Sequence, residues 1–247
     1  MKIALIQTEI VWGSPEANIA VMDTLIDHAG NADLYVLPEM FSTGFVMQPE
    51  NYAEKQGLSL KWMQGKARQT DAAVCGSLAV ADGDKFYNRF YFVKPDGSVA
   101  VYNKRHLFTY SGEHEHYQQG NGRTVVEWRG GRILLQVCYD LRFPVFSRNH
   151  KDYDLALYVA SWPESRRMVW DILLKARAIE NQCYVAGVNR VGDDQKCHYN
   201  GGTAIISPYG NVVSAAADNE TYVVVATLDM EKLKAFREKF PVLDDAD

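Results

Sequence analysis

The chain is organised around residues 131–150, Gly131-Arg-Ile-Leu-Leu-Gln-Val-Cys138-Tyr-Asp-Leu-Arg-Phe-Pro144-Val-Phe-Ser-Arg-Asn-His150. The apolar run from Ile133 to Val137 predicts a buried strand. Pro144 favours a helix start, because proline is tolerated in the first helical turn and resists a strand interior. Cys138 is therefore expected at a strand-to-turn corner, with a rigid element behind it and open space in front. That position suits a nucleophile, although a lone cysteine is more often a core residue.

The composition around this stretch is that of an ordinary globular protein, with 47% hydrophobic and 23% charged residues. No linker rich in proline, glycine, serine or charge divides the chain, so we expect residues 1–247 to form a single domain. The formal net charge is −5 and lysine and arginine form no cluster, which argues against nucleic acid or an anionic membrane as the main partner. A small molecule is the expected partner.

The N-terminal segment and the cysteines indicate the subcellular compartment. The apolar run within Met1–Glu9 is too short for a secretory signal, and nowhere do 18 apolar residues run together. Cys75, Cys138, Cys183 and Cys197 form no Cys-x-x-Cys pair, so neither a zinc ribbon nor a disulfide framework is indicated. We expect a cytoplasmic protein with reduced thiols. The two cysteines within apolar strand patterns, Cys75 and Cys183, are assigned to the core.

Hydrophobic periodicity predicts strands alternating with helices. Helices are expected after Ser14-Pro15, over 58–70, from about 169 to 181 and near the C-terminus around Leu233, Phe236 and Phe240. The stretch 109–122 is expected to be a loop. Strands at both ends with a meander between them indicate a layered α/β fold with mixed pairing. The expected strands are 3–7, 34–37, 73–79, 86–93, 99–102, 133–137, 155–159, 183–189, 203–206, 212–215 and 222–227.

Three reactive groups come directly after predicted strands. Glu39 follows the strand that Pro38 ends, Lys104 follows the meander, and Cys138 follows the strand described above. Each alone could be an ordinary surface or core residue. Because strand ends in α/β folds collect at one edge of the sheet, where ligand crevices form, the three together indicate a catalytic site.

The segments that carry these groups resemble the three signature motifs of the nitrilase superfamily of carbon-nitrogen hydrolases, in the same order and spacing. They are Leu37-Pro38-Glu39-Met40-Phe41, Lys104-Arg105-His106-Leu107-Phe108 and Cys138-Tyr139-Asp140-Leu141-Arg142-Phe143-Pro144. The resemblance covers essentially the whole chain, and the chain looks most similar to the omega-amidase branch. It implies a four-layer α-β-β-α sandwich with mixed sheets, a Glu-Lys-Cys triad and no metal or organic cofactor. It also implies that protomers pair into a homodimer or a higher oligomer.

Of two further positions, one matches the family pattern and one departs from it. Glu113 matches a second active-site glutamate that is common in it. Val145, by contrast, stands where many relatives carry a glutamate after Arg-Phe-Pro. The comparison therefore predicts a role for Glu113 near the triad and puts family-wide assignments for the helix after Pro144 in doubt.

The chemistry of amide hydrolysis assigns a role to each group. An amide needs an activated nucleophile, stabilisation of the tetrahedral oxyanion and a proton for the leaving ammonia. Cys138 is expected to attack, Glu39 to move the proton, and Lys104 with the backbone N–H of Tyr139 to hold the oxyanion. Glu113 is expected to accept a hydrogen bond from Lys104 or to orient the amide.

The substrate is predicted less directly. Arg142 could pair with a substrate carboxylate or form a structural ion pair, and Phe45, Tyr139 and Trp162 are candidate pocket residues. The omega-amidase resemblance implies small linear amides with a distal carboxylate, such as 2-oxoglutaramate and 2-oxosuccinamate, with water as the second substrate. N-carbamoyl amide hydrolysis and nitrilase activity remain alternatives.

One rival hypothesis for the site is a metal centre. The pair His114-x-His116 could bind zinc or iron together with nearby carboxylates. Those carboxylates are Glu113, Glu115 and Asp140. A metallohydrolase would lose activity with chelators and survive thiol alkylation, whereas a cysteine enzyme would behave in the opposite way.

Two other hypotheses keep the thiol but change its role. Cys138 could pair with His198 as a papain-like dyad. The chain could also be a binding or scaffold protein that has kept the fold and lost turnover, although all three triad residue types are present.

Overall fold

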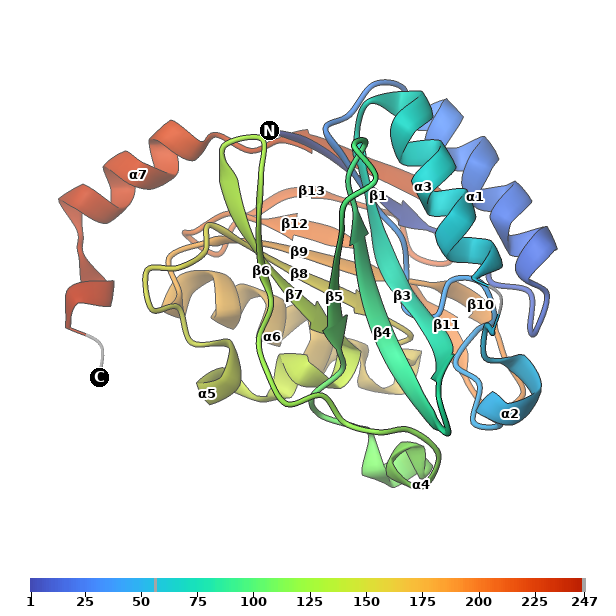
Figure 1. The fold of residues 1–247 in the computed structure, drawn as a ribbon. Coiled ribbons are helices and arrows are strands. Elements are labelled where there is room, and N and C mark those ends of the chain that lie inside the picture. The colour runs from blue at the N-terminus through green and yellow to red at the C-terminus, as the bar shows by residue number, and fades with distance from the viewer. Residues whose placement is uncertain (56, 246–247) are drawn as a thin grey trace.

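The computed structural model describes residues 1–55 and 57–245, and its centre is a pair of facing β-sheets (Figure 1). The first sheet has six strands in the order β14-β1-β2-β3-β4-β5. Strand β2 pairs in parallel with β1 and β3, and the remaining neighbours are antiparallel. The strands are β1 (Lys2–Gln7), β2 (Leu34–Val36), β3 (Ala73–Asp82), β4 (Lys85–Val93), β5 (Val99–Asn103) and β14 (Tyr222–Thr227).

The second sheet also has six strands, in the order β13-β12-β9-β8-β7-β6. Its central strand β8 is parallel to β7 and β9, and the outer neighbours are antiparallel. A small hairpin of β10 (Val191–Asp193) and β11 (His198–Asn200) stands apart from both sheets. The six strands are β6 (Val125–Trp128), β7 (Gly131–Val137), β8 (Leu155–Ala160), β9 (Tyr184–Asn189), β12 (Ala204–Ile206) and β13 (Val212–Ala215).

Helices form the two outer layers (Figure 1). Helices α1 (Pro15–Ala29) and α3 (Leu58–Thr70) cover the first sheet, and α5 (Pro144–Ser147) and α6 (Arg167–Glu180) lie on the outer side of the second. Helix α7 (Met230–Lys239) extends away from the sandwich near the C-terminus. The remaining helical turns are α2 (Pro49–Tyr52), α4 (Glu113–His116), η1 (Thr109–Ser111), η2 (Cys138–Arg142), η3 (Glu164–Arg166) and η4 (Val242–Asp244).

The alternation of side chains along each central strand explains the layers. In β8, Leu155, Leu157 and Val159 pack into the core between the sheets, while the alternate residues Ala156 and Tyr158 pack under α6. Strand β1 divides its side chains in the same way between the inter-sheet core and the helices α1 and α3. Strands buried on both faces read as continuous apolar runs, and this is why the sequence predicts them well. The predicted four-layer α-β-β-α sandwich with mixed sheets is confirmed.

Several expected boundaries differ from the structure. Strand β3 runs on to Asp82, and the expected loop at 109–122 contains the helical turns η1 and α4. Helix α7 ends at Lys239, and Phe240, which was expected to mark its apolar face, lies beyond it and is exposed. Strands β6, β10 and β11 were not predicted, because they are short and their polar or charged residues leave no apolar run.

The structure also shows whether any helix could span a membrane and whether the cysteines form disulfides. Over residues 1–55 and 57–245 no helix is long and apolar enough to cross a bilayer. Cys75 and Cys183 are buried in the core as predicted, and all four cysteines are free thiols.

Candidate active site

Glu39 lies in a turn that is fixed against strand β3. The turn follows β2, and Met40 has a φ of +44°, in the left-handed region that non-glycine residues rarely adopt. The backbone N–H of Met40 donates to Ser77 Oγ at 3.0 Å, and the N–H of Phe41 donates to the Ser77 carbonyl at 3.2 Å. A Cβ at Gly76 would lie 2.8 Å from the Leu37 side chain, so the close approach of turn and strand requires glycine there. Glu39 is thus held rigidly and is fully buried.

Lys104 follows β5 and is fixed by backbone hydrogen bonds on both sides. Its N–H donates to the Asn88 carbonyl at 2.9 Å, and its own carbonyl accepts from the Gly120 N–H at 2.8 Å. A Cβ at Gly120 would lie 2.1 Å from the Asn103 carbonyl oxygen, so only glycine allows this packing. The Lys104 side chain therefore points into the protein and is buried.

Cys138 is the first residue of η2 and has a φ of +47°. A non-glycine residue in this region costs roughly 1–3 kcal/mol and is found mostly where function requires it. The carboxylate of Asp140 holds the turn, because it accepts from Val137 N at 2.9 Å and from Tyr102 Oη at 2.7 Å. It also contacts His106 Nδ1 at 2.8 Å, which joins the cysteine turn to the segment that follows Lys104.

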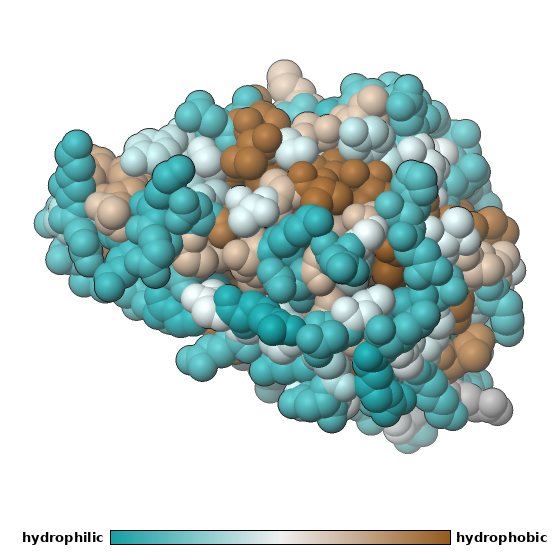
Figure 2. Space-filling model, turned by 90° about the horizontal axis from the view of Figure 1, so that it is seen from above, coloured by the Kyte–Doolittle hydropathy of each residue, from teal (hydrophilic) through white to brown (hydrophobic). Residues whose placement is uncertain are grey.

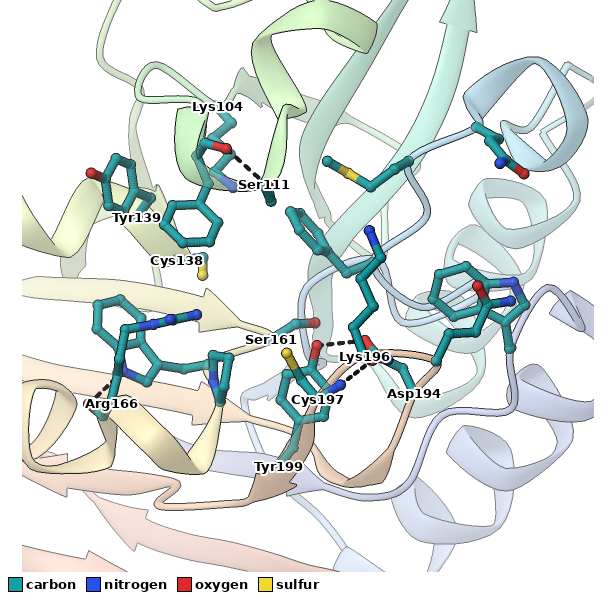
Figure 3. Close-up of a pocket in the computed structure, with 18 of the residues that line it drawn as sticks. Lys104, Ser111, Cys138, Tyr139, Ser161, Arg166, Asp194, Lys196, Cys197 and Tyr199 are labelled. Atoms are coloured by element: carbon teal, nitrogen blue, oxygen red, sulfur yellow. Dashed lines mark hydrogen bonds between the residues drawn. The ribbon is translucent and has the colours of Figure 1, made fainter.

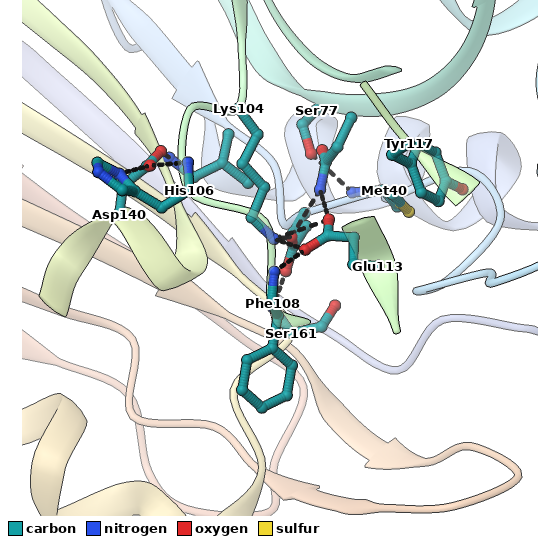
Figure 4. Close-up of polar contacts among 12 residues, drawn as sticks. Met40, Ser77, Lys104, His106, Phe108, Glu113, Tyr117, Asp140 and Ser161 are labelled. Carbon is teal, nitrogen blue, oxygen red and sulfur yellow. Dashed lines mark hydrogen bonds and ion pairs between the residues drawn. The ribbon is translucent and has the colours of Figure 1, made fainter. Parts of the chain in front are cut away.

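The Lys104 ammonium lies between two buried carboxylates (Figure 4). Its Nζ donates to Glu39 Oε1 at 3.0 Å and to both carboxylate oxygens of Glu113 at 2.9 Å. Helical turn α4 carries Glu113 to this position from a segment in which sequence reasoning expected only a loop. The structure therefore brings Glu39, Lys104 and Glu113 together.

Three donors that were not predicted from the sequence complete the contacts of the carboxylates. Asn88 Nδ2 donates to Glu39 Oε1 at 2.8 Å, and the backbone N–H of Ser161 donates to Glu39 Oε2 at 2.7 Å. Glu113 Oε2 accepts from the Phe108 N–H at 2.6 Å. The polar side chain of Asn88 within strand β4 (Lys85–Val93) was a signal for a buried contact, whereas a backbone donor such as that of Ser161 leaves no signal in side-chain chemistry.

The surroundings raise the pKa of Lys104, Cys138 and Glu113. Burial lowers the pKa of Lys104, but the charges of Glu113 and Glu39 more than offset this and leave it above its ordinary value. Burial and the charge of Glu39 raise the pKa of the Cys138 thiol well above its ordinary value, against the opposing charge of Lys104. Burial likewise raises the pKa of Glu113. At neutral pH the lysine is therefore charged and the cysteine is a thiol that needs a base to activate it.

Cys138 opens into a cavity with a largely aromatic wall (Figure 3). Phe45, Tyr139 and Trp162 line it as expected, and the Phe45 ring centroid lies 5.3 Å from Lys104 Nζ. Trp162 is also a core residue, since its ring packs on Trp170 at 5.4 Å. Tyr139 is the second residue of η2, where backbone N–H groups have no acceptor within the helix. The remaining lining residues include Trp12, Phe108, Asp194, Cys197 and Tyr199.

Arg142 lines the same cavity and forms no ion pair with any residue in the described part of the chain. Its guanidinium carbon lies 5.2 Å from the Trp162 ring centroid and 6.0 Å from that of Tyr139. The structural ion pair considered for Arg142 is therefore not formed with these residues.

The two rival sites are not assembled. Among residues 1–55 and 57–245 no three histidine, cysteine or acidic side chains are grouped to hold a metal, and His114 is exposed on α4. Glu113 and Asp140, which that hypothesis recruited, are bonded as described above. His198 is exposed, with Nδ1 2.9 Å from Asp193 Oδ1 and Nε2 3.0 Å from Asn219 Oδ1, so its ring does not serve Cys138.

The site combines a thiol at the end of a strand with a buried ammonium and two carboxylates. This combination is typical of hydrolases that use covalent catalysis. Comparison with known families agrees with this class. The family model for carbon-nitrogen hydrolases matches residues 2–238. The chain belongs to the carbon-nitrogen hydrolase family.

Individual relatives match over essentially the whole chain. The sequence is 48% identical to the omega-amidase YafV of Escherichia coli K12, covering 100% of this chain and 97% of that protein. It is 34% identical to the 2-oxoglutaramate amidase of Bacillus subtilis, covering 98% and 96%. XC1258 of Xanthomonas campestris, a CN-hydrolase superfamily protein solved with an arsenic adduct in its active site, has a TM-score of 0.97 and 40% identity over 100% of this chain and 97% of its own. The resemblance to the nitrilase superfamily is confirmed, and omega-amidases are among the relatives.

The raised pKa of Cys138 gives a prediction for alkylation. Because iodoacetamide reacts with the thiolate, labelling of Cys138 should keep rising with pH beyond the region near 8.5 in which a free cysteine titrates. In Glu39→Gln the carboxylate charge that raises this pKa is gone, so the midpoint should fall to a lower pH. Mass spectrometry of the Cys138 peptide measures the labelling rate at each pH.

The background for this measurement is Cys197→Ser, because Cys197 lines the same cavity. A labelling midpoint below that of a free thiol, or one that rises in Glu39→Gln, would contradict the electrostatic account.

Proposed function

We propose that this enzyme hydrolyses the terminal amide of small linear carboxylate-bearing amides, such as 2-oxoglutaramate and 2-oxosuccinamate, to the acid and ammonia. The observation that carries the proposal is the buried Lys104 ammonium, held between Glu39 and Glu113 in a cavity that also contains Cys138. The names of the relatives, omega-amidase and 2-oxoglutaramate amidase, support the substrate class.

In the first half of the proposed reaction, Cys138 Sγ attacks the amide carbon while Glu39 takes the thiol proton. The oxyanion lies against Lys104 Nζ and the backbone N–H of Tyr139. The positive charge of the lysine and the dipole of the N–H are both in place before the reaction begins. When the intermediate collapses, the carbon–nitrogen bond breaks. The proton held by Glu39 passes to the nitrogen, ammonia leaves and a thioester remains on Cys138.

The second half repeats these steps with water. Glu39 takes a proton from water, the resulting hydroxide attacks the thioester carbon, and the same donors hold the second oxyanion. The carbon–sulfur bond breaks and the proton returns from Glu39 to the Cys138 sulfur, which releases the carboxylic acid. In this scheme Glu113 positions Lys104, because both of its carboxylate oxygens accept from Nζ.

The cavity supports a substrate with a carboxylate. Arg142 lines it without a carboxylate partner among the described residues, and a guanidinium binds a carboxylate through two parallel hydrogen bonds. Phe45 and Trp162 provide apolar walls for the short methylene chain. We propose a cytoplasmic location as part of the same account, supported by the four free thiols.

We further propose that two copies pair through helix α6. Its residues Met168, Ile172 and Ile179 are 71%, 56% and 54% exposed, although an outer helix of a lone protomer would be expected to be polar there. Figure 2 shows the molecule from above, and on that face too hydrophobic residues gather near the centre. Packing α6 against its copy would extend the α-β-β-α sandwich across the dimer.

Removal of each proposed catalytic group gives a test of the reaction. Cys138→Ala should abolish ammonia release from 2-oxoglutaramate. Lys104→Ala should lower turnover by about two to three orders of magnitude, the usual cost of losing an oxyanion donor. Cys197→Ala removes the other thiol of the cavity and should retain activity. Near-normal turnover in Cys138→Ala or Lys104→Ala, with circular dichroism showing a folded protein, would rule out the mechanism.

The substrate is tested with the same assay on the wild-type enzyme. The two 2-oxo acid amides should be hydrolysed faster than glutamine, aliphatic nitriles or N-carbamoyl amino acids. Preferred turnover of nitriles or N-carbamoyl compounds would replace the proposed substrate by one of the alternative family activities.

The dimer is tested by sedimentation of Ile172→Glu. A charge in the centre of the α6 contact should shift the protein from dimer to monomer, because a buried unpaired carboxylate is costly. Val21→Glu, on the exposed face of α1 in the opposite outer layer, is the matched control and should remain dimeric. A wild-type monomer, or a dimer that Ile172→Glu leaves intact, would contradict the proposed contact.

A further inference from the structure

Most arginines in the described part of the chain donate from the side chain to a carboxylate or a backbone carbonyl. Those with neither partner there are Arg68, Arg142 and Arg166. Arg68 is exposed on α3 and needs no protein partner, because an exposed guanidinium is accessible to solvent. Arg142 and Arg166 are half-buried and line the same cavity as Cys138. Two guanidinium groups with unused donors therefore face the place where the substrate would bind.

The structure holds Arg166 in position without using its donors. Arg166 ends η3, and its carbonyl accepts from Trp162 Nε1 at 2.8 Å. Its guanidinium carbon lies 5.2 Å from the Phe108 ring centroid, and Figure 3 shows the side chain extending into the cavity toward Cys138. A planar guanidinium stacked on a ring keeps its N–H edge free for a ligand.

Asp194, the acidic residue among those that line the cavity, forms no ion pair with either arginine. Asp194 Oδ1 accepts from the backbone N–H groups of Lys196 and Cys197 at 2.7 and 2.8 Å, and its Oδ2 accepts from Tyr199 Oη at 2.6 Å. Glu39, which is buried behind the cavity wall, accepts from Lys104, Asn88 and Ser161, as described above. The cationic side chains that line the cavity without a carboxylate partner among the described residues are therefore Arg142, Arg166 and Lys196.

We propose that Arg166, together with Arg142, binds the 2-oxo-carboxylate end of the substrate and is the residue that sets specificity for 2-oxo acid amides. This inference rests on the proposed amidase function. A 2-oxo acid presents adjacent ketone and carboxylate oxygens, which are all acceptors, and two guanidinium groups supply only donors. An α-amino acid presents an ammonium at the same place, and like charges at close range disfavour its binding. Arg166 therefore both attracts 2-oxoglutaramate and discriminates against glutamine.

The test compares Arg166→Gln with Arg167→Gln. Arg167 is the next residue, carries the same charge, and pairs with Asp171 and Asp218 instead of lining the cavity, so it controls for the general loss of positive charge. Arg166→Gln should raise KM for 2-oxoglutaramate by about 10- to 100-fold, the usual cost of charged hydrogen bonds. Its turnover of the neutral amide butyramide should stay close to wild type, and its preference for 2-oxoglutaramate over glutamine should shrink. Arg167→Gln should match wild type on all three substrates.

A binding measurement keeps the test independent of turnover. By calorimetry, 2-oxoglutarate should bind Cys138→Ala and should bind Cys138→Ala/Arg166→Gln at least about tenfold more weakly. An unchanged KM and unchanged 2-oxoglutarate affinity in the Arg166 variants would overturn this inference alone. Equal losses on butyramide and 2-oxoglutaramate would also overturn it, since they indicate a structural role. A wild-type enzyme that shows no preference for 2-oxoglutaramate over butyramide would instead overturn the proposed substrate class.

Discussion

The site depends on the contact of the Lys104 ammonium with the carboxylates of Glu39 and Glu113, all of them buried. Burying an ion costs several kcal/mol even after relaxation, so the arrangement survives only when every charge is bonded on several sides. Glu39 meets that condition through Asn88 and Ser161, and Glu113 through Phe108. The same contacts keep Lys104 charged, which is what an oxyanion requires.

The fold supplies those partners from segments far apart in the chain. Lys104 lies next to Glu39, which is 65 residues away, and the backbone N–H of Ser161 reaches the same carboxylate across 122 residues. The ends of β2, β5, β7 and β8 converge there because two sheets pack face to face. Left-handed backbone at Met40 and Cys138 then turns each chain sharply at the sheet edge. The rigid sandwich offsets this local strain, which explains why the reactive groups follow strands.

Much of this arrangement can be predicted from the sequence, and the exceptions have physical reasons. Strands buried on both faces, such as β7 and β8, give continuous apolar runs. The position of Cys138 at the end of its strand could therefore be predicted from this pattern alone. Glu113 could be matched only through family resemblance, because no local pattern announces the helical turn that aims it. Arg166 was missed because Ser165-Arg166-Arg167 reads as a solvated surface, and only tertiary structure separates the arginine in the cavity from its paired neighbour.

The central claim is that Cys138 becomes acylated by an amide that then loses ammonia. The most direct measurement is mass spectrometry of the enzyme quenched in acid during turnover of 2-oxoglutaramate, followed by digestion. The account predicts a hydroxylamine-sensitive acyl group on the Cys138 peptide and none on the Cys197 peptide. Steady ammonia release with an unmodified Cys138 under conditions that preserve thioesters, or undiminished release from Cys138→Ala, would contradict it.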